Sequence, residues 1–393
     1  MNIHILSQTD LSKARKIWQQ LEANVTDITL ASKWLWIETW IEVYGDFIPY
    51  YFVYGERGGR SVGIMLITCE TGRTLPFPVK SYSIGTGGEP LKERTHVLNK
   101  SVLVIPNHKD QFVSALIEHV TKHFSWEELS LDFYRASDQR SFLKLFDKKN
   151  LKYRVIREHE YIMDLKVIRE SAKSVMDSLS SNTKYKIRRS LRGFGDDVTV
   201  EYGKTIDQTL KMYREMIVLH QKVWEGRGKR GMFASERFTK FHAEIIRKLH
   251  PTKGAAMIRV KSKKFGTLGC IYLLIDRGEA MMYQTGFSTF DGVTFEANTN
   301  RNKIKPGLVS HAMAMQLCMD ELGVDIYNYG PAEYQYKAEL TEAQRETCRI
   351  SVQNGIKPYL RDMFWNLYIK ADQNKTANAI LQPFYALYKK GGF

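Results

Sequence analysis

The clearest pattern of hydrophobic and polar positions lies between residues 280 and 340. Two short runs rich in aromatic and β-branched residues, Ala280–Phe287 and Asp325–Tyr329, predict strands. Between them, Pro306 opens a run with helical spacing that stops at Gly323, and this predicts a helix. Its apolar positions are Leu308, Val309, Ala312, Met315, Met319 and Leu322. The segment therefore reads as strand, loop, helix, strand and loop.

The second half of the chain contains further elements upstream of this segment. Apolar residues at helical spacing predict helices over Thr209–Val223 and Phe238–Leu249. Two apolar runs, Ala255–Val260 and Leu268–Ile275, flank the turn Lys261–Gly266 and predict a hairpin.

The first half shows the same order of elements. We expect helices from Ser12 to Leu21 and from Asp27 to Tyr44, hairpin strands Tyr50–Gly55 and Val62–Thr68, a strand from Ser81, a helix opened by Pro106, a strand Glu128–Tyr134, a helix around Phe142–Phe146 and strands over Tyr153–Leu165. Two landmarks occur in the same order in both halves. The hairpin residue Gly63 corresponds to Gly269, and the helix-opening residue Pro106 corresponds to Pro306. This order predicts a structural repeat.

The repeat predicts an α+β fold with mixed α/β sheets, built from two copies of one domain. We expect the first domain over residues 1–166 and the second over residues 167–356, joined near Val167. Apolar residues between 357 and 393 predict two amphipathic helices that pack on the second domain. A chain of 393 residues with 43% hydrophobic residues is long enough for two cores.

The chain is strongly basic, with a formal net charge of +15. This charge favours anionic small molecules, nucleic acid or an anionic membrane face as partners. Apolar runs stay short of the ~20 residues that span a bilayer, so any membrane contact would be peripheral. The 4 cysteines form no C-x-x-C pair, and the first residues lack a signal-peptide pattern. We therefore expect a cytoplasmic protein.

The loop between the strand Ala280–Phe287 and the helix at Pro306 is basic, with Arg301, Lys303 and Lys305. It leads to a helix start, where free backbone N–H groups and the positive end of the helix dipole bind anions. Such a loop can hold the pyrophosphate of a coenzyme without a Walker or Rossmann motif. An ordinary strand–helix–strand crossover with a solvated basic loop has the same pattern.

Five stretches carry a resemblance to a known family by their order. They are Ser32–Trp40, Tyr161–Leu165, Asn182–Ser190, Lys305–Val309 and Asn328–Lys337. This order resembles tandem GNAT acetyltransferase domains of the FemABX-like group. More narrowly, it resembles the CelD/BcsL acetyltransferase family that occurs with bacterial polysaccharide genes. The family often has Asp-Phe-Gly where this chain has Tyr327-Asn-Tyr-Gly330, a departure that bears on the acceptor pocket.

The resemblance implies an N-acyltransferase that takes its acyl group from acetyl-CoA or another acyl-CoA. The coenzyme would meet backbone groups of Gln284 and Gly286 and the helix start at Gly307 and Leu308, beside the basic loop. We expect no bound metal, because the sequence has neither an H-E-x-x-H motif nor Cys/His metal spacing.

Acid and base candidates follow the last strand. A phenol at this place is the usual acid of the fold, and Tyr336 and Tyr334 both lie there. Glu333 is the nearest carboxylate and a candidate base, because burial would raise its pKa. His220 is a second candidate base. The alternatives are packing roles for the two tyrosines, a solvated Glu333 and a structural His220.

A basic cluster offers a site for the acceptor. Lys184, Lys186, Arg188 and Arg189 lie close together on a predicted helix, with Lys184 and Arg188 on one face. With Lys337, which the resemblance implies as a substrate contact, they could bind an anionic acceptor such as a glycan precursor, or tRNA phosphates. The alternative is a solvated surface.

Three functions remain open at this point. The first is an acyl-CoA-dependent acyltransferase acting on an envelope or polysaccharide precursor. The second is a FemABX-like transferase that uses aminoacyl-tRNA, and the third is a non-catalytic interaction protein of polysaccharide assembly. We expect the second domain to be catalytic and the first to be a scaffold and acceptor wall. The reason is that the first domain's loop Thr95–Val104 carries little basic charge beyond Lys100.

Overall fold

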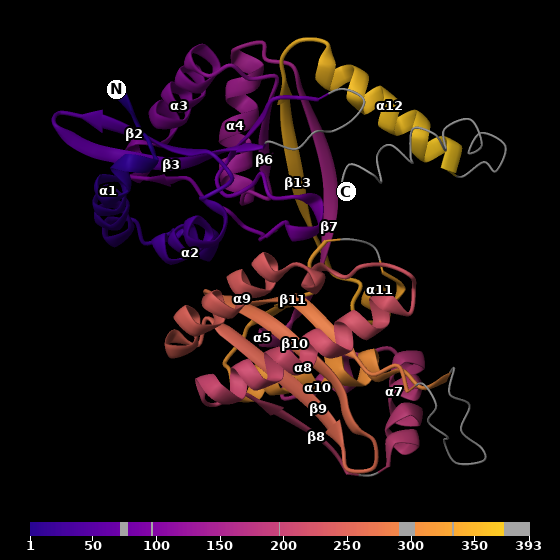
Figure 1. Ribbon diagram of the computed structural model, residues 1–393. Coiled ribbons are helices and arrows are strands. Elements are labelled where there is room, and N and C mark those ends of the chain that lie inside the picture. Colours follow the sequence, from indigo (N-terminus) through magenta and orange to yellow (C-terminus); the bar gives the residue numbers. More distant parts are fainter. Residues whose placement is uncertain (71–77, 96, 196, 291–302, 332–333, 373–393) are drawn as a thin grey trace. The chain divides into compact units, whose positions relative to one another are not determined.

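The computed structural model describes residues 1–70, 78–95, 97–195, 197–290, 303–331 and 334–372. Contacts divide the chain into two compact units (Figure 1). Unit 1 comprises Met1–Arg157 and Thr347–Phe393, and unit 2 comprises Glu158–Glu346. The chain enters unit 2 within strand β7 (Tyr153–Asp164) and returns to unit 1 within strand β13 (Gln344–Gln353).

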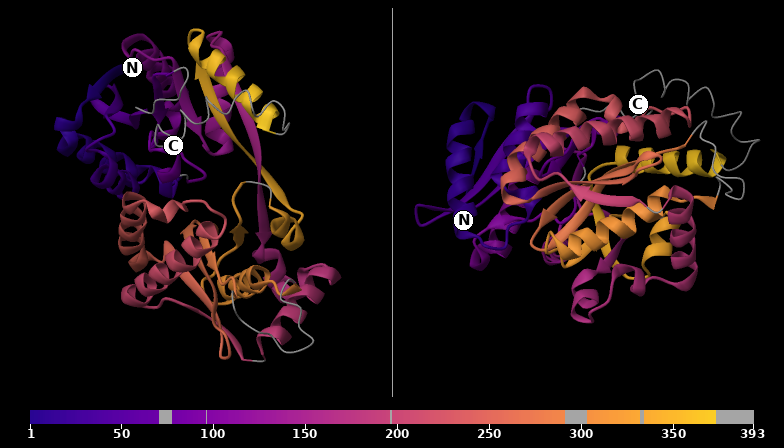
Figure 2. Two further views of the ribbon diagram at one scale, coloured as in Figure 1. Left: turned by 45° about the vertical axis from the view of Figure 1, so that its right-hand side comes forward. Right: turned by 90° about the horizontal axis from the view of Figure 1, so that it is seen from below.

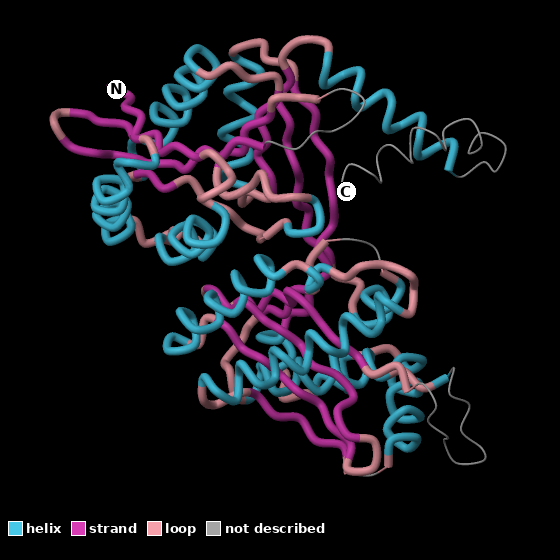
Figure 3. The backbone as a smooth tube through the Cα atoms, in the orientation of Figure 1, coloured by secondary structure: helices cyan, strands magenta, loops and turns pink. Residues whose placement is uncertain are grey.

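Unit 1 is a mixed sheet with helices on both faces (Figure 3). Its other elements are β1 (Asn2–Leu6), α1 (Leu11–Asn24), α2 (Trp34–Tyr44), β2 (Tyr50–Arg57), β3 (Arg60–Glu70), β4 (Ser81–Ile84), β5 (Leu103–Val104), α3 (Lys109–His123), β6 (Glu128–Asp132), α4 (Ala136–Lys148) and α12 (Lys357–Asp372). The strand order is β1-β2-β3-β4-β6-β13, and β5 pairs with β3. Neighbours are antiparallel except β4 and β6, which are parallel.

The unit 1 core forms because successive strand residues point to opposite faces. In β2, Phe52 packs against Trp18 and Trp34 of α1 and α2. The next residue, Val53, belongs to the core cluster under α3 and α4. Gly63 of β3 makes room for Phe112 of α3, since a Cβ at Gly63 would lie 2.8 Å from that ring.

Unit 2 repeats this plan. Its elements are α5 (Leu165–Glu170), α6 (Val175–Ser178), α7 (Ser181–Phe194), β8 (Val198–Tyr202), α8 (Ile206–Glu225), α9 (Glu236–Leu249), β9 (Ala255–Ser262), β10 (Gly266–Asp276), β11 (Glu279–Phe287), α10 (Pro306–Asp320), β12 (Ile326–Asn328) and α11 (Gln335–Leu340). The order is β7-β12-β11-β10-β9-β8, with β11 and β12 parallel and the other neighbours antiparallel. Helices α8 and α9 cover one face and α10 covers the other (Figure 2).

The predicted fold class is confirmed. The succession β2, β3, β4, α3, β6 in unit 1 matches β9, β10, β11, α10, β12 in unit 2. Strands β1, β5, β8 and β13 were not predicted. None of the helices within the described residues has the length and apolar composition needed to cross a bilayer.

The placement of the C-terminal helix on the second domain was wrong. In α12, Lys357 pairs with Glu127 at 2.8 Å and Arg361 with Glu128 at 2.5 Å, so this helix belongs to unit 1. The unit borders accordingly fall at 157/158 and 346/347, rather than at one join near Val167. The physical reason is that β13 pairs with β6 of unit 1 and carries the following residues with it.

Candidate active site

Strands β11 and β12 part in the middle of the unit 2 sheet. Their parallel ladder ends where Met281 meets Asn328. Beyond this point, the described residues give Met282–Phe287 only one ladder partner, strand β10. Tyr283 is the extra residue of a β-bulge in this pairing, a feature common beside active sites. Backbone groups on the β12 side of β11 therefore face the gap.

The start of α10 lies in the segment that links these two strands (Figure 1). Pro306 occupies its first turn, and the backbone N–H of Lys305 donates to Ser190 Oγ at 3.0 Å. Arg189 Nη2 donates to the carbonyl oxygen of Lys303 at 2.7 Å. Helix α7 thus binds the backbone of the residues just before α10, while the side chains of Lys303 and Lys305 remain exposed. This leaves two ammonium groups beside a helix N-terminus.

Two buried polar atoms near the start of α10 have no hydrogen-bond partner among the described residues: Ser310 Oγ and His311 Nε2. Ser310 lies against Gly269 of β10. The other ring nitrogen of His311, Nδ1, lies 3.2 Å from the hydroxyl of Tyr327. Burial lowers the pKa of His311 to about 3, so the imidazole is neutral near pH 7. Unpartnered buried atoms of this kind are typical of a place where a ligand binds.

Tyr336 lies directly against His311. The two rings are stacked, with centroids 5.3 Å apart and an interplanar angle of 9°. Tyr334 stacks on the other side of Tyr336 at 6.1 Å, but it is 56% exposed. Burial raises the pKa of Tyr336, so this phenol stays protonated at neutral pH. Of the two predicted acids, Tyr336 is therefore the enclosed one.

Lys337 is buried, with 2% of its surface exposed, so the alternative that it is a surface charge was wrong. Its Nζ donates to the carbonyl oxygens of Gly330 at 2.9 Å and Pro331 at 2.7 Å. Burial lowers the pKa of Lys337 to about 8. The ammonium group thus ties α11 to the turn that follows β12.

A buried polar network, which the sequence analysis missed, lies at the same turn. Asn328 Nδ2 donates to Glu160 and to Glu279, both at 2.7 Å. Arg345 Nη2 donates to the same two carboxylates, both at 2.6 Å. Asn328 Oδ1 accepts from the backbone N–H of Gly330 at 2.7 Å. The network therefore fixes the backbone at the point where β11 and β12 part.

The two carboxylates of this network differ in acidity. Burial raises the pKa of Glu160 despite the nearby charge of Arg345. Burial acts in the same direction on Glu279, but the hydrogen bonds and charge of Arg345 outweigh it and lower the pKa. One sequence feature pointed to this network, namely a charged residue, Glu160, inside the predicted strand region Tyr153–Leu165.

Several predicted coenzyme contacts have packing partners. Gln284 Nε2 lies 3.4 Å from Met232 Sδ, and the side chain of Leu308 is buried in the core. A Cβ at Gly286 would lie 2.4 Å from the carbonyl oxygen of Met216, so this glycine lets α8 approach β11. A Cβ at Gly307 would make ordinary contact with the ring of Phe287. Arg301 and Glu333 lie outside the described residues.

Three of the four predicted acceptor cations of α7 are held by other groups of the chain. Lys184 Nζ donates to the carbonyl oxygen of Asp177 at 2.9 Å, and Lys186 pairs with Glu339 at 3.1 Å. Arg189 holds the Lys303 carbonyl as described above. Arg188 is exposed. The structure therefore does not gather these four cations with Tyr336 in one set of contacts among the described residues.

His220 has a structural role on α8. Trp224 Nε1 donates to His220 Nε2 at 2.9 Å, and His220 Nδ1 lies 3.2 Å from Gln221 Oε1. With both ring nitrogens engaged, the imidazole has no free site for a proton. Among the described residues, no group of His, Cys, Asp and Glu is arranged to hold a metal ion.

Comparison with known proteins agrees with this geometry. Residues 181–338 match the family described as acetyltransferase (GNAT) domain. The matched segment lies within unit 2, so this unit resembles a GNAT acetyltransferase domain. The match includes α7, the parted strands, α10 and the residues Tyr336 and Lys337. Among curated proteins, none matches this chain in sequence.

Solved structures were also compared with this chain. A crystal structure of FemX is 12% identical, covers 92% of this chain and 99% of its own, and superposes with a TM-score of 0.56. A tandem GNAT protein from the clavulanic acid biosynthesis pathway is 11% identical, with coverages of 90% and 99% and a TM-score of 0.45. L-PGS from Bacillus licheniformis is 14% identical, with coverages of 88% and 95% and a TM-score of 0.49. The FemX likeness indicates a shared fold.

Proposed function

We propose that unit 2 catalyses acyl transfer from acetyl-CoA or another acyl-CoA to an amine. The observation that carries this proposal is the gap between β11 and β12, with the start of α10 in the linking segment and Tyr336 stacked on α10, within the segment that matches the GNAT domain. Backbone groups of β11 from Gln284 to Gly286 would hold the pantetheine arm. The helix start at Gly307 and Leu308, with Arg301, Lys303 and Lys305, would hold the pyrophosphate.

The reaction requires two proton movements. A base removes a proton from the acceptor ammonium, and the amine nitrogen then attacks the thioester carbonyl. The C–S bond breaks as the C–N bond forms, and the thiolate takes a proton from an acid. We assign the acid to Tyr336, which burial keeps protonated, with Tyr334 as the exposed alternative. We retain Glu333 as the candidate base.

We propose that the acceptor is an anionic precursor of an envelope component or polysaccharide, because the chain is basic and resembles a family that occurs with bacterial polysaccharide genes. Lys184, Lys186, Arg188 and Arg189 on α7 would contact it, while Lys337 would shape its site through the turn after β12. Unit 1 would act as scaffold and acceptor wall. Acyl-CoA donors and reduced cysteines both favour the cytoplasm as the place of action.

Thermal unfolding with and without acetyl-CoA tests the donor. A ligand at about 100 times its Kd stabilises the folded state by about 2.7 kcal/mol. We expect this stabilisation in the parent and its loss in the double variant Pro306→Ala/Gly307→Val, which reshapes the helix start in unit 2. The matched control is Pro106→Ala/Asn107→Val at the equivalent turn in unit 1, which should keep the full shift. A parent that acetyl-CoA does not stabilise would reject the proposal.

An aminoacyl-tRNA donor is the second candidate, favoured by the FemX-like fold and the net charge of +15. A site that neutralises phosphates releases counterions, so its affinity must fall steeply with salt. Binding of charged tRNA measured across a salt series decides between the donors. Steep salt dependence together with no effect of acetyl-CoA would favour tRNA. If neither donor binds, the chain is a non-catalytic interaction protein.

A further inference from the structure

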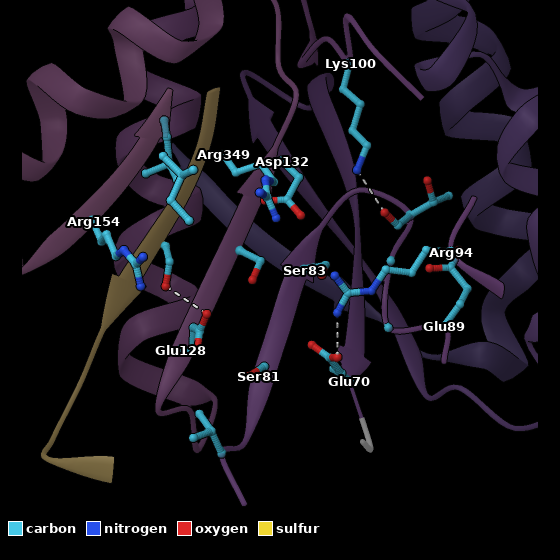
Figure 4. Close-up of a pocket in the computed structure, with 18 of the residues that line it drawn as sticks. Glu70, Ser81, Ser83, Glu89, Arg94, Lys100, Glu128, Asp132, Arg154 and Arg349 are labelled. Atoms are coloured by element: carbon cyan, nitrogen blue, oxygen red, sulfur yellow. Dashed lines mark hydrogen bonds and ion pairs between the residues drawn. The ribbon is translucent and has the colours of Figure 1, made fainter. Parts of the chain in front are cut away.

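Unit 1 encloses a pocket of its own, about 460 Å³ in volume, over strands β4, β6 and β13 (Figure 4). This volume lies in the range of about 300–1,000 Å³ that is typical of small-molecule sites. Ser81 and Ser83 of β4 and Ser130 of β6 line it. The alternating residues Tyr82 and Leu129 belong to the core cluster under α3 and α4, so the serines point out of the opposite face of the sheet.

This pocket is not a second coenzyme slot. In unit 1, Tyr134 follows β6, and its hydroxyl donates to the carbonyl oxygen of Ile84 on β4 at 2.9 Å. Tyr134 is buried in the core on the α3 side. The tyrosine thus closes the place where the corresponding strands of unit 2 part. The serine-lined pocket lies on the other face of the sheet.

The charged groups of the pocket are already matched with one another. Its acidic residues are Glu70, Glu89, Glu128, Asp132 and Asp362, and its basic residues are Arg94, Lys100, Arg154, Arg349 and Arg361. Arg94 pairs with Glu70 at 3.2 Å, and Arg361 pairs with Glu128 at 2.5 Å. In Figure 4, Arg349 and Asp132 point toward each other, and Lys100 donates to the carbonyl oxygen of Thr86 at 3.0 Å. A charged ligand would have to disrupt one of these pairs.

Four hydroxyl groups of the pocket, by contrast, are available, whereas Thr95 Oγ1 donates to Glu89 and Ser351 Oγ donates to Glu128. Thr86 is 4% exposed, and its Oγ1 has no hydrogen-bond partner in the described part of the chain. The hydroxyls of Ser81, Ser83 and Ser130 likewise make no hydrogen bond to another described residue. A hydroxyl group both donates and accepts, so a ligand with many hydroxyls can satisfy serines, carboxylates and guanidinium groups together.

We propose that this pocket binds an uncharged mono- or disaccharide, held by Ser81, Ser83, Ser130 and Thr86 and by the outer faces of the ion pairs. Val79 and Ile156 supply apolar contacts for the C–H groups of a sugar ring. Among the described residues that line the pocket there is no aromatic ring, so a nucleobase would lack a stacking partner. The proposal does not depend on acyl transfer in unit 2.

Isothermal titration calorimetry with D-glucose, D-galactose, N-acetyl-D-glucosamine and lactose tests the proposal on the full chain. We expect saturable binding of at least one of these sugars. D-glucuronate and D-glucosamine, which add a charge of either sign, should bind more weakly than their neutral counterparts. Saturable binding also separates a site from the general stabilising effect of excluded sugars at high concentration.

The double variant Ser83→Ala/Ser130→Ala removes two hydroxyls that have no protein partner, so folding should be unaffected. Loss of two hydrogen bonds should weaken sugar binding about tenfold. The matched control is Ser137→Ala/Ser141→Ala on α4, outside the pocket, which should bind as the parent does.

Two outcomes would overturn the proposal. One is that no neutral sugar binds, and the other is that a charged sugar binds more tightly than its neutral counterpart. Acetyl-CoA binding, measured separately, reports on unit 2 alone, so the two proposals can fail independently.

Discussion

The imidazole of His311 on α10 and the phenol of Tyr336 on α11 are stacked, with an interplanar angle of 9°. The stack holds a protonated phenol against α10, the helix that begins in the segment linking the two parted strands. Replacing Tyr336 by Phe keeps the ring and removes only the hydroxyl. We expect kcat to fall by about a hundredfold to ten-thousandfold, the usual contribution of a general acid, with little change in thermal stability.

The control for this variant is Tyr334→Phe, which removes a hydroxyl from an exposed tyrosine two residues away. It should retain parent activity in a steady-state assay with the acyl donor. The opposite result, loss in Tyr334→Phe and retention in Tyr336→Phe, would assign the acid to Tyr334.

A buried histidine should make stability depend on pH. Burial lowers the pKa of His242 to about 3 from an ordinary value of 6.5. Between these values the unfolded chain binds a proton and the folded chain does not, so the free energy of unfolding falls as pH falls. The contribution reaches about 1.4 kcal/mol per pH unit.

Urea unfolding at pH 7 and pH 5 checks this. His242→Phe should lose less stability than the parent between the two pH values, because both nitrogens of His242 lack partners among the described residues and a phenyl ring can pack against Phe238 and Phe241 in its place. His159→Gln, at an exposed position, should behave as the parent. Parallel curves for His242→Phe and the parent would contradict the prediction.

Replacing Lys337 should destabilise unit 2, because its buried ammonium group binds two backbone carbonyl oxygens. Lys337→Met keeps the length of the side chain but leaves the carbonyl oxygens of Gly330 and Pro331 without their donor. We expect a loss of about 1–3 kcal/mol in the free energy of unfolding. Lys166→Met, at an exposed ion pair, should change stability by less than about 1 kcal/mol. Equal effects in the two variants would mean that the Lys337 contacts contribute little.

The network around Asn328 makes a stronger prediction. Arg345→Met leaves Glu160, whose side chain is 1% exposed, without its cation. Removing one partner of a buried ion pair destabilises by about 3–5 kcal/mol. The matched variant Arg169→Met breaks a pair with Asp325 in which both side chains are at least 40% exposed, and it should cost less than about 1 kcal/mol. Denaturant unfolding measures the loss of stability in both variants. A smaller loss in Arg345→Met than in Arg169→Met would contradict the prediction.

Two glycines of the site should respond differently to a methyl group. In Gly286→Ala the new Cβ would meet the Met216 carbonyl oxygen at 2.4 Å, and overpacking of this kind costs about 1–3 kcal/mol. In Gly307→Ala the nearest atom lies at 3.4 Å, and alanine favours a helix, so stability should be unchanged or higher. Thermal unfolding of the two variants tests this difference. Equal losses of stability would contradict the assignment of Gly286 to helix packing.

Much of the fold could be predicted because its signals are local. Pro306, the helical spacing after it and the apolar hairpin Ala255–Ile275 depend on neighbours in sequence. The assignment of α12 to unit 1 could not be predicted, because it depends on the pairing of β13 with β6, a strand from about the first third of the chain. The Glu160–Arg345 contact was missed for the same reason, since its partners lie 185 residues apart and neither belongs to a motif. The packing of α8 against Gly286 was missed because sequence alone does not reveal that this helix approaches the glycine.

The return of the chain to unit 1 through β13 has a consequence for synthesis. Unit 1 receives a strand of its sheet only after all of unit 2 has been made, and Ser351 reaches Glu128 across 223 residues of chain. Until then β6 presents an open edge to whatever pairs with it. Unit 2 is continuous and can complete its own sheet first. Synthesis of unit 2 must therefore be finished before the sheet of unit 1 can be completed, and the nascent chain is exposed to wrong strand pairing while unit 2 is being made.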